Sequence, residues 1–342
     1  MLPSRLHRLR PRRALLAALL GAAGLSALSL ASAQQAPLEK AVMFIGWRAE
    51  AEWGGFFQAL ATGLYKKHGL DVEIRLGNPQ SNSVPMLLGG KVDFTGGTSG
   101  SALNAVRENV PLVTVAAFFQ KDPRILMAHP GQGNDTLQQM KGKPILVAPQ
   151  GLNTFWPFVR SKYGFSDDQV RPYTFSLAPF LADKKVIQQG YITHEPFAVS
   201  KAGVSSPVVV LLADHGYEQY VTNLVTTREN VEKRPEFVQR FVNASIEGWY
   251  SYLYKDPTPG NDFIKKNNPD MTDDQIAYTI KVMKDAGLVD SGDTKRLGIG
   301  AMTEARWDTF YKDMSAAGLY PAGLDPKKAY TTQFVNKKVG MP

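Results

Sequence analysis

The sequence predicts an α/β protein with two lobes, each built on a parallel-rich sheet flanked by helices. Short apolar runs alternate with segments of helical spacing, as in residues 42–45, 56–67 and 72–76. This order is typical of a parallel sheet covered on both faces. The chain has 342 residues, which is more than one hydrophobic core usually supports.

The first block of elements follows from local patterns. Residues 42–45 are apolar and end at Gly46, as expected of a buried strand. Residues 56–67 have apolar side chains at helical spacing, and His68 with Gly69 supplies a helix stop. The other expected elements are strands at 72–76, 91–95 and 112–118 and helices at 84–88 and 102–108.

A second α/β block begins near Gly142. We expect strands at 145–148, 173–175 and 208–212 and helices at 154–163 and 179–185. The chain from Arg234 onward reads as mainly helical, with one apolar stripe formed by Phe237, Phe241, Ser245, Trp249 and Leu253. Residues 124–128 and 224–227 are the expected links between the blocks, so the predicted lobes are 38–127 plus 220–342, and 128–219.

The N-terminus has the layout of a secretory signal peptide. Five arginines precede an apolar run over residues 14–30, and Ala31, Ser32 and Ala33 follow. We expect cleavage after Ala33, which leaves about 309 of the 342 residues; a retained membrane anchor is the alternative. Arg12 and Arg13 leave export by the Sec or the twin-arginine route open.

Cleavage removes most of the apparent basic character. The precursor has 39 Lys and Arg against 31 Asp and Glu, a formal charge of +8, and the mature chain has 34 against 31, or +3. Nucleic-acid binding therefore loses its main support. The absence of cysteine excludes disulfides, thiolate metal sites and a Cys nucleophile. We find no His cluster with metal-ligand spacing, and we expect no cofactor and no metal.

Several short motifs resemble one family of transport proteins. They include Gly63-Leu64-Tyr65, Gly90-Lys91-Val92-Asp93-Phe94, Gln189-Gly190-Tyr191 and Thr193-His194-Glu195-Pro196. In this order they resemble the periplasmic substrate-binding proteins of ABC importers in the thiamine-pyrimidine-precursor, sulfonate and nitrate group, over nearly the whole mature chain. The resemblance implies a two-lobed periplasmic binding protein fold of the type II kind, which closes on a ligand in the cleft between its lobes.

In such a fold the ligand lies outside the carboxyl ends of the strands. The loop after the first strand carries Trp47 and Trp53, which are candidates for stacking on a flat ligand; the alternative is that one of them caps the core. Trp53 stands where the pyrimidine-precursor binders have a His, which leaves the ligand open. After the third strand, Thr98 and Ser99 open a helix and could bind an anion or a carbonyl, or could simply cap that helix.

The second block offers the facing half of the site. Asn153 and Thr154 open a helix and could hydrogen-bond a ligand, or could cap the helix. The resemblance places Glu195 in the cleft, where its carboxylate would accept from ligand N–H groups, with Tyr191 beside it. A partly buried Glu needs such a partner; the alternative is a solvated Glu at a helix start.

We expect an exported binding protein, not an enzyme. It would capture a small aromatic or heteroaromatic ligand and deliver it to an ABC permease and its ATPase, and it would be a monomer by analogy. A sulfonate or nitrate binder and a receptor-coupled sensor are the alternatives. A related branch of the superfamily makes the thiamine pyrimidine with a Cys-rich motif, which this chain lacks.

Overall fold

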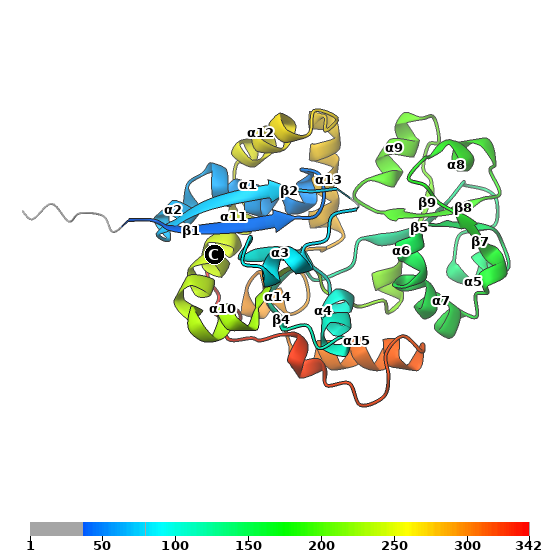
Figure 1. Ribbon diagram of the computed structural model, residues 1–342. Helices are drawn as coiled ribbons and strands as arrows, with labels where there is room; N and C mark the ends of the chain where they lie inside the picture. The colour runs from blue at the N-terminus through cyan, green and yellow to red at the C-terminus, as the bar shows by residue number, and fades with distance from the viewer. Residues whose placement is uncertain (1–36, 79, 342) are drawn as a thin grey trace, which may run out of the picture. The chain divides into compact units, whose positions relative to one another are not determined.

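The computed structural model describes residues 37–78 and 80–341 (Figure 1). The predicted signal peptide, residues 1–33, lies outside the described residues. The chain from Leu38 onward forms one compact unit. Within the described part of the chain, no helix has both the length and the apolar character needed to cross a membrane.

The first sheet takes four strands from the N-terminal part of the described chain and one, β10, from after the second sheet. Its order is β2-β1-β3-β10-β4, and β1 pairs with β2 in parallel over seven residues, from Glu39 opposite Leu70 to Ile45 opposite Leu76. Only β10 runs against its neighbours among these strands. The strand bounds are β1 (Glu39–Ile45), β2 (Leu70–Leu76), β3 (Phe94–Gly97), β4 (Leu112–Phe119) and β10 (Val221–Thr227).

The second sheet is built from the middle of the chain and repeats the same plan. Its order is β7-β6-β8-β5-β9, and β5 runs antiparallel to both β8 and β9. The bounds are β5 (Arg124–Ala128), β6 (Ile145–Val147), β7 (Val170–Pro172), β8 (Ile187–Tyr191) and β9 (Val208–Leu211). The protein is therefore an α/β fold with two mixed sheets, as the sequence predicts.

The chain passes between the two sheets in two short segments. Residues 120–123 lead from β4 into β5, and residues 212–220 lead from β9 back into β10. The expected linking segments, 124–128 and 224–227, therefore lie inside a sheet instead of between the sheets, because their apolar residues pair with neighbouring strands. The residue limits that we predict for the two lobes stay a prediction.

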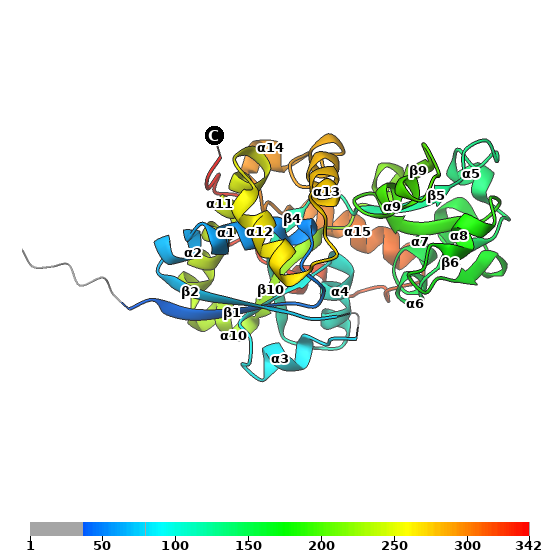
Figure 2. The same ribbon diagram turned by 90° about the horizontal axis from the view of Figure 1, so that it is seen from above.

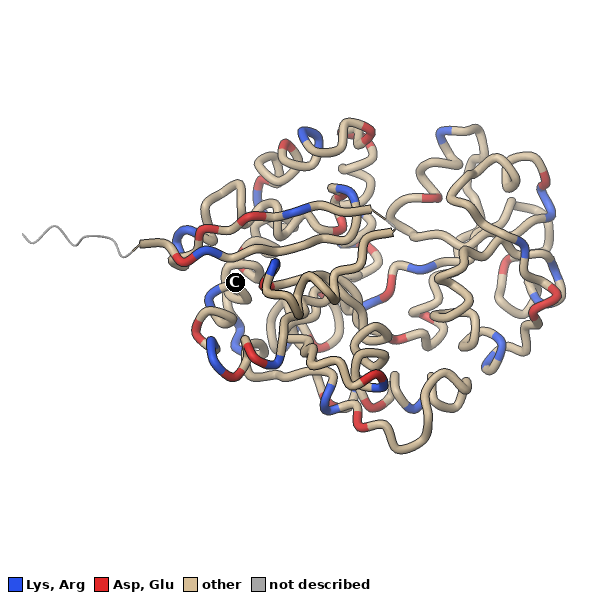
Figure 3. Tube along the Cα trace, in the orientation of Figure 1, with Lys and Arg blue, Asp and Glu red and all other residues tan. Residues whose placement is uncertain are grey.

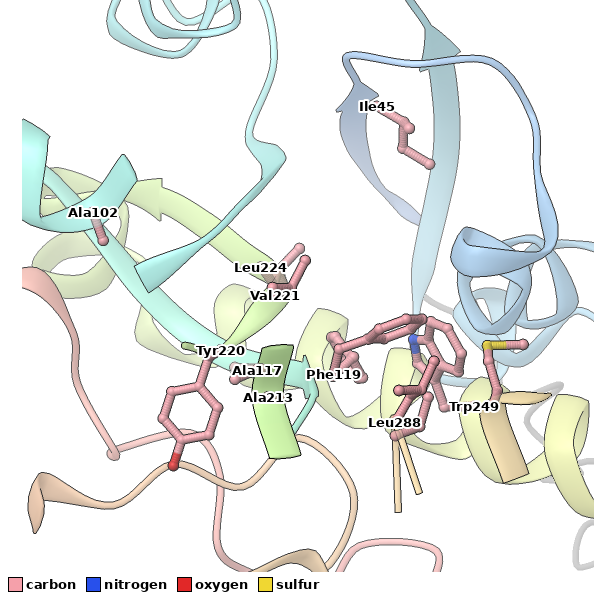
Figure 4. Close-up of a cluster of buried hydrophobic side chains, with 14 of the residues drawn as sticks. Ile45, Ala102, Ala117, Phe119, Ala213, Tyr220, Val221, Leu224, Trp249 and Leu288 are labelled. Atoms are coloured by element: carbon pink, nitrogen blue, oxygen red, sulfur yellow. The ribbon is translucent and has the colours of Figure 1, made fainter. Parts of the chain in front are cut away.

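The core is centred where α11 (Pro235–Tyr254) packs on α1 (Gly54–Ala61). Gly248 permits this close packing, since a Cβ there would lie 2.3 Å from the carbonyl oxygen of Gly55. The predicted apolar stripe of α11 is buried throughout. Figure 4 shows Trp249 of this helix beside Phe119 and Leu288.

Other helices surround the two sheets (Figures 1 and 2). They are α2 (Leu64–Lys67), α3 (Val84–Leu88), α4 (Ser99–Arg107), α5 (Leu137–Met140), α6 (Pro149–Leu152), α7 (Phe155–Tyr163), α8 (Ala178–Ala182), α9 (Glu195–Lys201), α10 (Arg228–Lys233), α12 (Thr258–Asn267), α13 (Asp273–Asp285), α14 (Thr294–Leu297) and α15 (Glu304–Ala316). Short 3-10 turns are η1 (Ala51–Trp53), η2 (Asp167–Gln169), η3 (Leu212–His215) and η4 (Pro326–Ala329). Acidic and basic residues are interspersed along the chain (Figure 3).

Two further predicted elements differ from the structure, and the strand β8 (Ile187–Tyr191) was not predicted. The helix expected at 56–67 is broken into α1 and α2, because Gly63 adopts a left-handed conformation with φ 74°. The strand expected at 173–175 is wrong: β7 ends at Pro172, and Phe175 has a φ of 62° that no strand can accommodate. Residues 173–175 therefore belong to the loop that follows β7.

Candidate functional site

Two aromatic side chains from different sheets face each other. Trp47 follows β1, and Phe175 follows β7; their ring centroids lie 6.4 Å apart with a 57° angle between the planes. Phe175 is 54% exposed, which is unusual for so large an apolar side chain. Tyr173, itself buried, supports it with a centroid distance of 5.3 Å. The loops after the strands thus form an aromatic surface with an open side.

Three carboxylates lie next to this aromatic pair. Glu50 and Glu52 follow Trp47 in the chain and are half-buried. Burial raises the pKa of Glu50 to about 8, and the charges of Glu52 and Glu195 push it in the same direction, while Trp47 and Arg48 oppose the shift. The loop after β1 therefore holds a carboxyl group that keeps its proton near neutral pH.

Glu52 belongs to the same cluster. Burial raises its pKa, and the charge of Glu195 adds to the effect, whereas the Thr193 hydroxyl and His194 lower it. The loop that carries Thr193 is held in place by α13, since Gln275 and Thr279 both donate to the Thr193 carbonyl, at 3.1 and 2.9 Å. Loops from both sheets thus meet at these carboxylates.

The Glu195 side chain makes its hydrogen bonds within the chain. Glu195 is the first residue of α9, and its carboxylate accepts the backbone N–H of Tyr191 at 2.6 Å and the hydroxyl of Tyr173 at 3.2 Å. Burial raises the pKa of Tyr173, and the Glu195 charge reinforces this. Two neutral donors hold the carboxylate and fix its orientation, and contact of Glu195 with a ligand stays a prediction.

Trp53 lies at the base of the same region. A Cβ on Gly96 would come within 2.3 Å of its indole, and its ring is 6.1 Å from that of Phe56. Trp53 is thus half-buried, with one face on the glycine backbone of β3 and another toward the core. A stacking role for Trp53 stays a prediction.

The loop after β3 uses its hydroxyl groups locally. Thr98 accepts the backbone N–H of Ser101 at 3.1 Å, and Ser101 accepts that of Thr98 at 2.9 Å, which completes a capping box at the start of α4. Ser99 is buried and accepts the backbone N–H of Tyr220 at 3.1 Å. Both residues therefore carry structural hydrogen bonds, and their contact with a ligand stays a prediction.

The turn between α6 and α7 also satisfies its own polar groups. Thr154 donates to the carbonyl of Gln150 at 3.0 Å, and Asn153 is exposed at the end of α6. Phe155 and Trp156 are buried, and the indole N–H of Trp156 donates to Asp167 at 2.8 Å. Trp156 is thus a core residue beside the second sheet, and ligand binding by Asn153 and Thr154 stays a prediction.

Sequence reasoning missed part of the cluster. Phe175 and Tyr173 escaped because their segment was assigned to a strand. Glu50 and Glu52 lie in the same loop as Trp47, and their position just after a strand was an available signal. Arg124 was missed because its neighbours, such as Tyr191, are distant in sequence: its Nη2 donates to the Tyr191 hydroxyl at 3.1 Å.

The chain is similar to several known proteins. A family model described as NMT1/THI5 like matches residues 50–259. Riboflavin-binding protein RibY of Chloroflexus aurantiacus is 23% identical over 309 residues, which cover 88% of this chain and 87% of that protein. The aliphatic sulphonate binding protein SsuA from Escherichia coli, a periplasmic protein, has a similar structure, with a TM-score of 0.64, 12% identity and coverage of 85% of this chain and 91% of the other.

The desulfurization enzyme DSZB also has this fold, with a TM-score of 0.52, 11% identity and coverage of 86% of this chain and 97% of the other. At such low identity a structural likeness shows the fold alone, and this fold serves both a binding protein and an enzyme. The family model, by contrast, spans more than half of the chain. The chain has the fold of the periplasmic binding proteins, and it belongs to the NMT1/THI5-like family.

Proposed function

We propose that the protein is an exported solute-binding protein that captures a small, flat heteroaromatic ligand between Trp47 and Phe175. The observation that carries this proposal is the facing pair itself, since its two rings come from loops of different sheets. A single lobe would hold only one face of the ligand. Closure of the predicted lobes, 38–127 plus 220–342 and 128–219, would bring the second ring onto the ligand.

The distance between the Trp47 and Phe175 rings indicates that the two loops must open for a ligand to enter. A flat ring between two aromatic planes needs about 7 to 8 Å, since each stacked contact spans about 3.5 to 4 Å. Trp47 and Phe175 are 6.4 Å apart and tilted. The two loops must therefore separate slightly and align their rings to admit a ligand, which couples binding to lobe movement.

The charges beside the pair favour a neutral ligand over an anion. Glu50, Glu52 and Glu195 lie within each other's field. Arg48, the nearby cation, pairs with Asp270 at 3.3 Å on the surface. A pyrimidine or flavin ring with N–H groups suits such a site, and RibY, the similar protein from Chloroflexus, is named for riboflavin binding.

A sulfonate-type anion is the second candidate ligand. It is favoured by the name of SsuA, whose fold this chain shares, and by the buried cation Arg124, which lies near Tyr191. For either ligand we propose delivery to an ABC permease and its ATPase, after export by the N-terminal signal peptide. A receptor-coupled sensor is the remaining binding role, and pyrimidine synthesis is the role least favoured.

Calorimetric titration of the mature protein tests the ligand class. We expect riboflavin or an aminopyrimidine to bind with a dissociation constant in the micromolar range or below, and an alkanesulfonate to bind more weakly. Trp47→Ala and Phe175→Ala should each weaken binding of the flat ligand at least tenfold. Leu88→Ala removes a comparably exposed apolar side chain from α3 and should leave binding unchanged.

The proposal fails if the flat ligands do not bind while the alkanesulfonate does, or if Leu88→Ala weakens binding as much as Phe175→Ala. Import is tested separately in cells. Deletion of the gene should abolish uptake of the bound ligand at low external concentration, and deletion of the partner permease should do the same. Normal uptake without the protein would favour the sensor role.

A further inference from the structure

Arg124 occupies an unusual place in the fold. It is the first residue of β5, immediately after the chain has passed from the first sheet to the second, and it pairs in register with Tyr191. Its guanidinium carbon lies 5.2 Å from the ring centroid of Phe155 and 5.1 Å from that of Tyr191. Its side chain is only 12% exposed. A full positive charge is therefore buried among the loops of the candidate site.

Within the described chain, the Arg124 side chain donates one hydrogen bond, and its buried Nε donates none. A guanidinium group has five N–H donors and is always charged. Nη2 donates to the Tyr191 hydroxyl at 3.1 Å. Nε is buried and has no hydrogen-bond partner among the described residues. The nearest carboxylate oxygen, on Asp122, is 4.0 Å from Nε, which is too far for a hydrogen bond.

Asp122 does not depend on the guanidinium for its own partners. One of its carboxylate oxygens accepts the backbone N–H of Arg124 at 2.8 Å, and the other accepts the side-chain amide of Gln219. Gln219 in turn accepts the backbone N–H of Gly100 at 3.4 Å. This network ties the two crossing segments to the start of α4. The Arg124 side chain lies beside the network without completing it.

A buried charge with unmade hydrogen bonds is costly, and a ligand or an ordered water is what supplies the missing acceptor in native proteins. Arg124 lies within the field of Glu195, the carboxylate that Tyr191 and Tyr173 hold. The site therefore offers N–H donors at Arg124, a carboxylate acceptor at Glu195, and the carboxyl groups of Glu50 and Glu52, whose pKa values are raised by burial. A ligand that presents acceptors and donors along one edge would satisfy both sides.

We propose that Arg124 is a ligand-binding residue that selects heteroaromatic rings with a carbonyl edge, by donating hydrogen bonds to that edge. This inference rests on the proposed function, and it specifies which polar groups the ligand carries. The class is a neutral ring with carbonyl oxygens beside a ring N–H. An apolar ring leaves the Arg124 guanidinium without an acceptor, and an anion would lie in the field of the Glu195 carboxylate.

Three ligands and four proteins test this assignment by calorimetry. Riboflavin has two carbonyl oxygens beside a ring N–H, whereas indole has an N–H and no carbonyl. The proteins are wild type, Arg124→Met, Arg124→Lys and the control Arg160→Met, which removes an exposed cation of α7 that pairs with Asp167 at 3.1 Å. An alkanesulfonate is titrated in parallel, and the melting temperature of each ligand-free protein is recorded.

We expect Arg124→Met to weaken riboflavin binding about 10- to 100-fold, the usual loss for a hydrogen bond to a charged group. Its effect on indole should be less than about twofold, because indole has no carbonyl for the guanidinium to hold. Arg124→Lys should recover part of the riboflavin affinity, since it keeps the charge and loses the planar fork. Arg160→Met should match the wild type with both ligands.

Equal weakening of riboflavin and indole by Arg124→Met would overturn the assignment. So would an alkanesulfonate that binds tightly and loses its affinity in the same variant, because Arg124 would then select anions. If the wild type binds none of the probes, the proposed function fails and the ligand-free melting temperature decides about Arg124. A melting temperature of Arg124→Met close to that of the wild type shows that Arg124 is not needed for folding, which supports the assignment. A fall of about 8 °C or more shows that Arg124 stabilises the fold, which overturns the assignment.

Discussion

The aromatic cluster around Trp249 and the pair of Trp47 with Phe175 use the same kinds of side chain for different purposes. Trp249 is fully buried, with ring centroids of Phe56 and Phe118 at 6.0 and 5.7 Å. It lies within a continuous buried cluster (Figure 4). Every face of the indole is occupied by protein, so its burial stabilises the fold.

The pair in the candidate site has few such neighbours. Phe175 is 54% exposed, and Trp47 is only partly buried, although the two rings contact each other across the two sheets. Large apolar side chains in open loops contribute little to the stability of the fold, because little of their apolar surface is removed from water on folding. The difference teaches that position relative to the strand ends, and not residue type, separates core aromatic residues from candidate ligand contacts.

The largest expected effect is a loss of stability when Trp249 in the core is replaced. Trp249→Ala should lower the free energy of unfolding by about 3 to 5 kcal/mol, because it leaves a cavity among Phe56 and Phe118. Chemical denaturation measures the loss. Trp249→Phe keeps an aromatic ring and removes an indole N–H that has no hydrogen-bond partner in the described chain, so it should cost clearly less. Equal losses in the two variants would contradict the packing argument.

A substitution in the candidate site should reduce ligand affinity and leave the free energy of unfolding nearly unchanged. Trp47→Ala should weaken binding of the flat ligand by about 10- to 100-fold, through loss of a stacked face, and should change the free energy of unfolding by less than about 1 kcal/mol. Titration calorimetry and denaturation on the same preparation separate the two quantities. A loss of stability comparable to that of Trp249→Ala would place Trp47 in the core and remove the contrast between the two regions.

The acidic cluster should make stability depend on pH. Glu50 has a pKa of 4.5 in the unfolded chain and about 8 in the folded one. Because the folded state holds its proton more tightly, its contribution to stability is present below about pH 4.5 and is lost as the pH rises toward 8. The expected loss is about 1 to 2 kcal/mol, since the half-buried group is screened by water.

Thermal unfolding between pH 4.5 and 8 measures this slope. Glu50→Gln, which is uncharged throughout, should flatten it, and Glu108→Gln, an exposed control on α4, should not. An unchanged slope in Glu50→Gln would show that the carboxyl group is already ionised at pH 5 in the folded protein.

The smallest expected effect concerns Thr98, which was predicted as a ligand contact and forms a capping box. Thr98→Ala should lower the free energy of unfolding by about 1 kcal/mol, and Thr98→Ser should restore most of it. If Thr98 acts only as a cap, ligand affinity stays the same in both variants. A tenfold loss of ligand affinity in Thr98→Ala would show that Thr98 contacts the ligand as well as capping α4.

Most strands and the main apolar stripe of α11 could be predicted from local patterns. The buried runs of β1 and β4 and the spacing of Phe237, Phe241 and Trp249 depend on residues close in sequence. The loop after β7 could not be predicted, because Tyr173 and Phe175 are as suitable for a strand as for a loop. A left-handed φ at Phe175, which local propensity disfavours, is set by the structure around it.

The sequence by itself determined the fold class and indicated the family, since periodicity and short motifs are local properties of the chain; it did not indicate β8 (Ile187–Tyr191). Only the tertiary structure decided which side chains share the candidate site. Trp47 and Phe175 come from loops of different sheets and meet only when both sheets form, and Arg124 meets Tyr191 and Phe155 in the same way. The physical reason is that burial and charge coupling act through space, so the unpartnered N–H of Arg124 and the raised pKa of Glu50 exist only in the folded protein.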